Sequence, residues 1–153
     1  MANGDLSILE AALAGEYFGV SAYDAALGLN VLSAGAAQVA RNFQSDHRDH
    51  ATRISDEICA LGGQPPATKS WAEYAELYPP PALETEADVL RYAASLERSA
   101  AAADANALAE LESPELRVLF ARIGAVEAMH WAVLLQALGE NPVPSSLLPA
   151  DQA

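Results

Sequence analysis

Four segments of this chain carry apolar side chains at alternating steps of three and four residues, and this spacing constrains the fold most strongly. The segments lie at about 5–30, 35–61, 86–111 and 114–138. An α-helix brings side chains at such steps onto one face, so we expect four helices that each bury one face. The expected faces contain Leu6, Leu9, Leu13, Val20 and Leu27; Val39, Phe43, Ile54, Ile58 and Leu61; Leu90, Ala93, Ala100, Leu108 and Leu111; and Leu116, Phe120, Ile123, Leu134 and Leu138.

The composition favours an all-α fold, because alanine, leucine and glutamate are abundant and β-branched residues are scarce. At 153 residues, the length fits a single domain, which we expect to span 1–153. The formal net charge of -13 leaves no basic face for phosphates, so we expect no nucleic acid and no membrane as partners. Cys59, the single cysteine, excludes an internal disulfide and is compatible with a cytoplasmic protein. Its residue type predicts a small buried side chain.

Capping residues predict where the helices begin and end. The first helix is expected to start near Asp5, with Ser7 and Glu10 as an alternative capping box. Two later helices are expected to begin after a capping residue, Thr85 with Asp88 and Ser113 with Pro114. Glycines that stop a helix, Gly62 and Gly139, mark two helix ends. The tail from 139 to 153 contains several prolines and is expected to be irregular.

The segment 62–85 is expected to be a long crossover rather than a tight turn, because it is rich in proline, including all of 79–81. Such a connection can run the length of a helix pair and allows the helices on either side to lie parallel. It contains one short amphipathic piece with three aromatic residues, Trp71, Tyr74 and Tyr78. We expect these rings to seal the crossover onto the helices; the alternative is an exposed dimer surface.

Each apolar face is interrupted near its middle by acidic or imidazole side chains. They are Glu16 on the first helix, His47 and His50 on the second, Glu97 on the third, and Glu127 and His130 on the fourth. An isolated carboxylate in an apolar interior is unfavourable or is forced to protonate, and divalent cations compensate for this directly. A spacing of three residues also lets both members of a pair bind one ion or adjacent ions. The sequence therefore predicts a buried metal site.

With these residues the chain resembles the ferritin-like superfamily, which includes bacterioferritins and the helical domain of rubrerythrin. The resemblance covers about residues 6–138 and implies a four-helix bundle with a long crossover between helices two and three. Members build a di-iron or di-manganese site from a glutamate on helices one and three and a Glu-x-x-His motif on helices two and four. The resemblance thus implies five metal ligands, Glu16, His50, Glu97, Glu127 and His130. Tyr23 lies where several relatives carry a tyrosine close to the metals.

His47 departs from the family pattern, which has at this position a glutamate that commonly bridges the two metals. The three matched glutamates would leave one positive charge on a pair of divalent ions with neutral histidines. His47 remains a candidate ligand, and Asp46 is a candidate for a fourth carboxylate if helix two is rotated slightly. Asp104 is a further candidate, as a charge or as a hydrogen-bonding partner of a ligand. A single ion, or an asymmetric pair rich in nitrogen ligands, also fits these residues.

Two functional classes follow from this pattern. The first is a metal-dependent oxidase, similar to ferroxidases, that binds iron or manganese and reacts with oxygen or peroxide. In that class Tyr23 is a candidate for a catalytic residue. The second is a bundle without catalysis, which has a degenerate site or a structural zinc ion and acts as a dimeric binding or structural protein. A homodimer is compatible with both classes.

Overall fold

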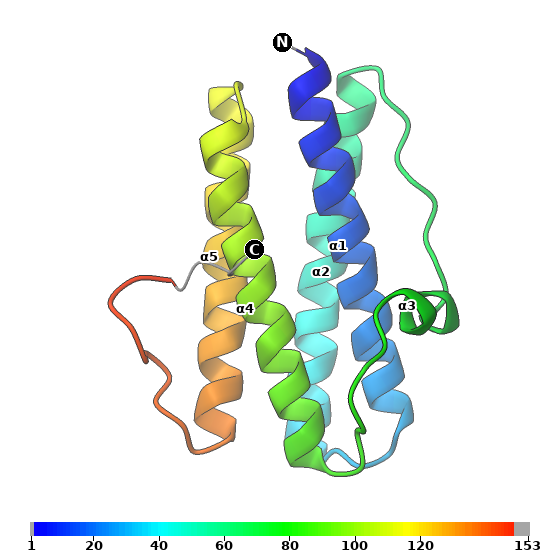
Figure 1. The fold of residues 1–153 in the computed structure, drawn as a ribbon, viewed down its shortest axis with the longest axis vertical. Helices are drawn as coiled ribbons and strands as arrows, with labels where there is room; N and C mark the ends of the chain where they lie inside the picture. Colours follow the sequence, from blue (N-terminus) through cyan, green and yellow to red (C-terminus); the bar gives the residue numbers. More distant parts are fainter. Residues whose placement is uncertain (1, 149–153) are drawn as a thin grey trace. The chain divides into compact units, whose positions relative to one another are not determined.

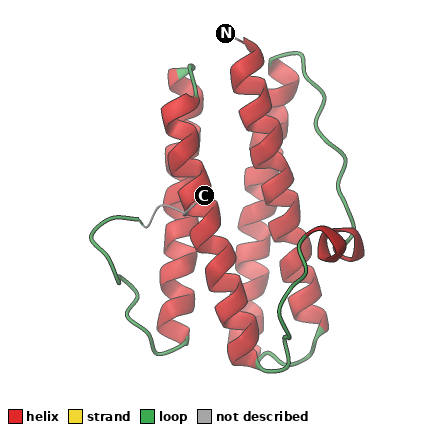
Figure 2. Ribbon diagram, viewed as in Figure 1, coloured by secondary structure: helices red, strands yellow, loops and turns green. Residues whose placement is uncertain are grey.

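The computed structural model describes the backbone of residues 2–148 and the side chains of residues 4–148. This part of the chain forms five helices and no strand (Figure 1, Figure 2). The helices are α1 (Ala2–Gly28), α2 (Ala34–Ala60), α3 (Trp71–Leu77), α4 (Glu86–Glu110) and α5 (Pro114–Ala137). The predicted all-α class is confirmed. The chain groups into two compact units, Leu9–Val89 and Met1–Ile8 together with Leu90–Ala153. That residues 1–153 form a single domain remains a prediction.

In the unit Leu9–Val89, α1 and α2 run antiparallel, side by side (Figure 1). Their predicted apolar faces are confirmed, since four of the predicted side chains have no exposed surface: Leu9, Leu13, Ile54 and Ile58. Gln44 of α2 is also buried and donates from Nε2 to the backbone oxygen of Val20 at 3.0 Å. This bond satisfies a buried amide and links the two helices near their centres.

A tight connection joins α1 to α2. Asn30 takes a left-handed conformation with φ 56°, which asparagine tolerates better than most residues, and this terminates α1. Ser33 then caps α2 by accepting the backbone N–H of Ala36 at 3.3 Å. The backbone N–H of Ser33 donates to a carboxylate oxygen of Glu86, the first residue of α4. The crossover therefore returns the chain to the end of the pair at which α2 begins.

The crossover between α2 and α4 packs onto α1 through aromatic rings. The ring centroid of Phe18 in α1 lies 6.1 Å from that of Trp71, 5.2 Å from that of Tyr74 and 5.7 Å from that of Tyr78. Tyr74 is 4% exposed, whereas Tyr78 is 60% exposed. The aromatic segment, which forms α3, thus seals the crossover onto α1 as predicted, with Tyr74 as the most deeply buried ring.

In the other unit, α4 and α5 also run antiparallel, side by side (Figure 1). Ser113 caps α5 by accepting the backbone N–H of Leu116 at 3.2 Å, and proline follows it at the first helical position. Asp5 is 6% exposed and accepts the backbone N–H groups of Glu112 at 2.7 Å and Ser113 at 3.1 Å. A buried carboxylate therefore holds the turn between α4 and α5.

Most of the other predicted boundaries are confirmed. Thr85 and Asp88 form the predicted cap of α4, with the Thr85 N–H donating to Asp88 Oδ2 at 3.0 Å and the Asp88 N–H donating to Thr85 Oγ1 at 3.2 Å. Gly62 and Gly139 follow α2 and α5 with φ 80° and φ 75°, as glycines that stop a helix do. Residues 140–148 of the tail contain no helix, and the rest of the tail lies outside the described residues.

Three local predictions are wrong. The first helix begins at Ala2 rather than near residue 5, so Ser7, the alternative cap, lies inside the helix. Leu61 is 40% exposed because it follows the last residue of α2. Cys59 is exposed although its residue type predicts burial, because it lies one position after Ile58 and therefore off the buried face.

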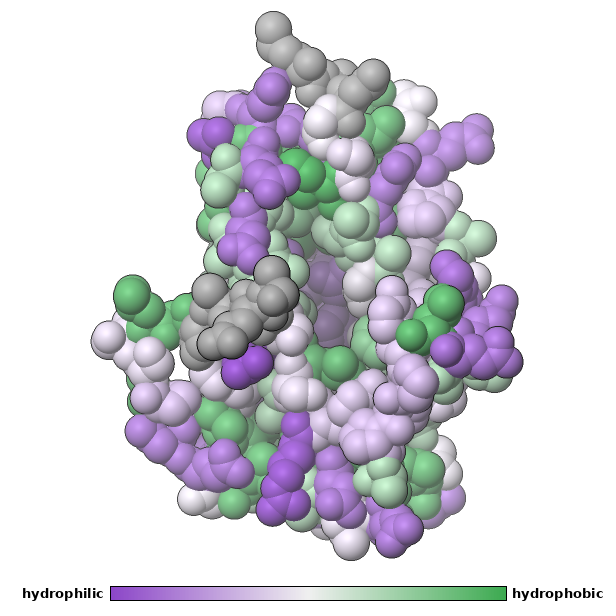
Figure 3. Space-filling model, viewed as in Figure 1, coloured by the Kyte–Doolittle hydropathy of each residue, from purple (hydrophilic) through white to green (hydrophobic). Residues whose placement is uncertain are grey.

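Hydrophilic side chains, drawn purple, cover much of the face shown in Figure 3, with apolar residues scattered among them. Among the described residues, α5 is the one helix long and apolar enough to cross a membrane, and 33% of its most apolar window is buried. Three of its large apolar side chains are exposed, Val118, Met129 and Val133. Core helices of helical proteins have the same length and composition, so this property alone is weak evidence for a membrane span.

Candidate metal centre

Glu16 of α1 and the two histidines of α2 converge in the unit Leu9–Val89. Glu16 Oε2 lies 2.7 Å from His47 Nδ1, and Glu16 Oε1 lies 3.5 Å from His50 Nδ1. The spacing of three residues puts both imidazoles on one face of α2. Each of the three side chains offers a ligand atom, and these atoms lie within 4.8 Å of one another. We call Glu16, His47 and His50, which are all buried, the α1–α2 triad.

Gly19 lies one turn after Glu16 and makes room for the His47 imidazole. A Cβ atom added at Gly19 would lie 3.0 Å from His47 Nδ1 and 3.1 Å from two carbons of the ring. These distances are shorter than ordinary van der Waals contact, so an alanine would push against the ring. Gly19 was not predicted from the sequence. The sequence signal that could have revealed its role is a glycine inside a predicted helix, since glycine there lowers helix stability by ~1 kcal/mol relative to alanine.

The Glu16 carboxyl is held in its ionised form. Burial raises its pKa, but hydrogen bonds and charge interactions with His47 and His50 together outweigh burial, so the pKa of Glu16 lies below its ordinary value. Tyr23 lies two turns further along α1, is 7% exposed, and has its ring centroid 5.7 Å from that of His47. Tyr23 therefore lies beside a candidate ligand, while its catalytic role stays a prediction.

A second group converges between α4 and α5. His130 Nδ1 lies 3.3 Å from Glu97 Oε2 and 3.4 Å from Glu127 Oε2. Each of these three side chains also offers a ligand atom, and the atoms lie within 4.8 Å of one another. Glu127 has no exposed surface, Glu97 is 2% exposed and His130 is 4% exposed. We call Glu97, Glu127 and His130 the α4–α5 triad.

The α4–α5 triad stabilises positive charge. Burial lowers the pKa of His130, but its hydrogen bonds and charge interactions with Glu127 and Glu97 outweigh burial and raise the pKa to about 9. The imidazole is therefore protonated at neutral pH when no metal is bound. A divalent cation would meet the same two carboxylates and would replace that proton.

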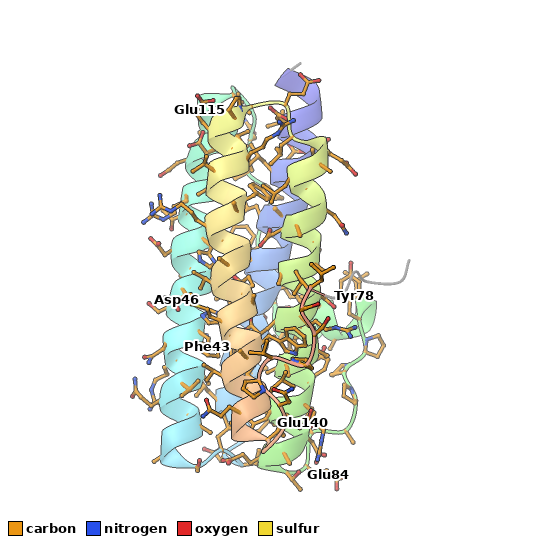
Figure 4. All side chains as sticks on the ribbon, turned by 90° about the vertical axis from the view of Figure 1, so that its left-hand side faces the viewer. Phe43, Asp46, Tyr78, Glu84, Glu115 and Glu140 are labelled. Atoms are coloured by element: carbon orange, nitrogen blue, oxygen red, sulfur yellow. The ribbon has the colours of Figure 1, made fainter. Side chains whose placement is uncertain are left out.

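The two aspartates considered from the sequence lie outside the triads. Asp46 is exposed and projects outward from α2, whereas Phe43, one turn earlier, lies on the inner side of the helix and is 8% exposed (Figure 4). Asp104 is buried on α4, two turns beyond Glu97. A Cβ atom added at Gly124 of α5 would lie 3.0 Å from the Asp104 Cβ, so Gly124 makes room for this side chain as Gly19 does for His47.

The donor atoms of both triads suit divalent metal ions. The α1–α2 triad offers one carboxylate and two imidazoles, and the α4–α5 triad offers two carboxylates and one imidazole. Carboxylate and imidazole are common ligands of iron, manganese and zinc. Buried carboxylates also need positive charge to balance them, which a metal ion can supply in place of a protonated histidine. Together the triads contain the six side chains that the sequence singles out as metal ligands, Glu16, His47, His50, Glu97, Glu127 and His130.

Two solved structures share this fold. A conserved hypothetical protein from Mycobacterium tuberculosis is 20% identical with a TM-score of 0.78, and the match covers 95% of this chain and 97% of that one. A dodecameric thioferritin, the bacterioferritin-related protein from Bacteroides fragilis, is 22% identical with a TM-score of 0.75, covering 91% of this chain and 86% of that one. At these identities the likeness concerns the fold alone, and it confirms the predicted ferritin-like four-helix class.

Comparison of the sequence with curated proteins and with family models tests whether the chain belongs to a known family. No curated protein matches the chain significantly. A model of a family described as ferritin-like domain matches residues 4–140, which is most of the chain and includes every residue of both triads. The chain therefore belongs to the ferritin-like domain family.

Proposed function

We propose that this protein is a metal-dependent oxidase of the ferritin-like kind, which binds iron or manganese and reacts with oxygen or peroxide. The observation that carries the proposal is the presence of two buried triads, each with imidazole and carboxylate donors within 4.8 Å of one another. The family pattern, a glutamate on one helix and a Glu-x-x-His motif on the other helix of each pair, supports a di-iron or di-manganese site.

The side chains of the triads supply charge, ligand atoms and a dry environment. Glu16, Glu97 and Glu127 provide three negative charges at buried positions, which favour divalent over monovalent cations. The three imidazoles provide nitrogen donors and hold the ions against exchange. A reduced pair of iron or manganese ions would supply two electrons, which with two protons convert hydrogen peroxide to two molecules of water. Buried apolar side chains on the same helices, such as Ile54 one turn after His50, would limit the access of solvent to the oxidant.

Elemental analysis of protein purified without chelators or an affinity tag tests this proposal. The parent should contain two equivalents of iron or manganese, and Glu127→Ala with His130→Ala should lose at least one of them. The matched control changes two exposed residues of the same helix, Glu115→Ala with Gln136→Ala, and should keep the parent metal content. A parent that stays empty after anaerobic incubation with ferrous or manganous salt would contradict the proposal.

One observation favours a second candidate function. His47 replaces the glutamate of the family pattern and gives the α1–α2 triad two nitrogen donors, a set that also suits zinc. In that case the protein is a non-catalytic bundle that holds structural zinc and acts as a dimeric binding or structural protein. Oxygen uptake by the ferrous-loaded protein separates the two functions, because the oxidase consumes oxygen or peroxide and the structural bundle consumes neither.

We also propose that the protein associates with itself in the cytoplasm. The Bacteroides fragilis protein that shares the fold is a dodecamer, and the sequence is compatible with a homodimer. Light scattering after size-exclusion chromatography gives the molar mass, which should be at least twice the 16.0 kDa of one chain. A mass of a single chain at all concentrations would contradict self-association.

A further inference from the structure

We propose that this protein has a second binding site, separate from the triads, which takes an organic carboxylate with an apolar body. The site is a pocket lined by α4, α5 and the segment that follows α5. Its volume of about 600 Å³ lies within the range of sites for small organic molecules. The inference goes beyond the proposed function, because binding of this ligand requires no metal ion.

Two walls of the pocket come from the spacing of residues on α4 and α5. On α4, Arg91, Ser95 and Arg98 follow one another at steps of four and three residues, so they share one exposed face of the helix. On α5, Trp131 and Leu135 lie one turn apart and line the opposite wall. One wall is therefore polar and cationic, and the other is apolar.

The turn after α5 supplies the third wall. Gly139 has φ 75°, and its N–H donates to the Gln136 oxygen at 3.0 Å, while the Glu140 N–H donates to the Leu135 oxygen at 2.9 Å. These two hydrogen bonds are those of a Schellman motif, which ends the helix and reverses the chain (Figure 1). The reversal brings Glu140 and Asn141 to the rim of the pocket.

The charge of the pocket differs in sign from that of the whole chain. The formal net charge is -13 with only eight lysine and arginine residues, yet two of the eight, Arg91 and Arg98, line this one pocket. With Glu140 they leave one positive charge, which matches a single carboxylate better than a doubly charged phosphate ester. Guanidinium groups bind carboxylates through two parallel hydrogen bonds. The pocket therefore suits a monoanion.

The apolar wall indicates what the rest of the ligand is made of. Trp131 is half-buried and Leu135 is 8% exposed, and Leu138 and Ala94 extend the same lining. Sites for small organic molecules combine such apolar lining with a few polar groups that fix the orientation of the ligand. The ligand therefore has an aliphatic or aromatic body that packs on the indole ring, with its carboxylate directed to the arginines.

The pocket and the α4–α5 triad use the same helix turns but different faces. Arg98 follows Glu97 on α4, and Trp131 follows His130 on α5. Successive residues of an α-helix point about 100° apart, so the side chains of the triad are buried while those of the pocket open to its surface. Binding of the carboxylate and binding of metal can therefore be measured and removed separately.

Calorimetric titration of the full chain with decanoate, a carboxylate with an aliphatic body, tests the inference. Arg91→Ala with Arg98→Ala should weaken decanoate binding at least about tenfold, because the charged hydrogen bonds to the carboxylate are lost. The matched control, Arg41→Ala with Arg53→Ala, removes the same charge from exposed positions on α2 and should bind as the parent does. Decanol, which has the same body without the charge, should bind the parent at least about tenfold more weakly than decanoate.

A second variant locates the binding in the pocket. Ser95→Trp fills the pocket from an exposed position on α4 and keeps both arginines, so it should also weaken decanoate binding at least about tenfold. Decanoate binding that is absent in the parent, or equal in the parent and either pocket variant, would overturn the inference. Tighter binding of decyl phosphate than of decanoate would overturn the assignment to a carboxylate. Glu127→Ala with His130→Ala, which tests the proposed function, should leave decanoate binding unchanged.

Discussion

The two helix pairs follow one plan and differ at one decisive side chain. In each pair a glutamate of one helix faces two side chains, three residues apart, of the other helix. These are His47 and His50 in α2, and Glu127 and His130 in α5. The first residue of the motif is a histidine in one pair and a glutamate in the other. Helix geometry therefore fixes where the ligand atoms lie, while residue identity at a single position sets the balance between nitrogen and oxygen donors.

Removing one nitrogen from each triad should give the largest contrast. His130→Gln takes the imidazole that lies 3.3 Å from Glu97 and 3.4 Å from Glu127, whereas His50→Gln leaves His47 beside Glu16 in the α1–α2 triad. We expect Zn²⁺ affinity to fall ~100-fold at the altered triad in the first variant and ~10-fold in the second. Competition with a chromophoric zinc chelator measures both values. Equal losses would show that the count of nitrogen donors does not set the affinity.

The turns of the two pairs should also differ in their contribution to stability. The carboxylate of Asp5 is 6% exposed and accepts two backbone N–H groups at the α4–α5 turn, so Asp5→Ala should lower the free energy of unfolding by ~2–3 kcal/mol. Glu86 accepts the Ser33 N–H at an exposed position, where water can replace the bond, so Glu86→Ala should lower the free energy of unfolding less than Asp5→Ala does. Denaturation by urea of metal-free protein measures both. A larger loss in Glu86→Ala would reverse the proposed ranking of the two turns.

The roles of Asp5 and Glu16 show how far sequence could predict this molecule. Glu16 was predicted as a ligand because the helical period alone places it among Leu9 and Leu13 on a buried face. The same reasoning placed the helices and the caps at Thr85 and Ser113. The sequence marks Asp5 only as the start of a helix, because its hydrogen-bond partners lie more than one hundred residues away and no local pattern reveals them.

Gly19 and Cys59 mark two further limits. The sequence shows a glycine inside a helix, but only the packed structure shows the His47 ring against it. Cys59 was predicted as buried from its residue type, although its position beside Ile58 already places it off the apolar face. Helical periodicity therefore predicts the burial of a side chain better than residue type does. Neither predicts which side chains pack against each other between helices.

Two glycines of α1 offer a test of that packing. Gly15→Ala meets no atom within 4 Å and should stabilise the protein by ~0.5–1 kcal/mol through helix propensity. Gly19→Ala pushes on the His47 ring, so it should gain no stability and should weaken Zn²⁺ binding ~10-fold at the α1–α2 triad. Thermal melts and the zinc competition assay read the two effects separately. Unchanged zinc affinity in Gly19→Ala would mean that the ring moves without leaving its ligand position.

The smallest effect is expected for Gly124→Ala, the counterpart of that change in the other helix pair. The new Cβ would lie 3.0 Å from the Asp104 Cβ, which costs packing energy while helix propensity offsets part of it, so stability should change by less than ~1 kcal/mol. Asp104 lies outside the α4–α5 triad, so the metal content and affinity should equal those of the parent. Elemental analysis and Mn²⁺ titration check this. A loss of manganese in Gly124→Ala, with the fold intact, would indicate that Asp104 is part of the metal site. Gly124 would then position a metal ligand, as Gly19 does for His47.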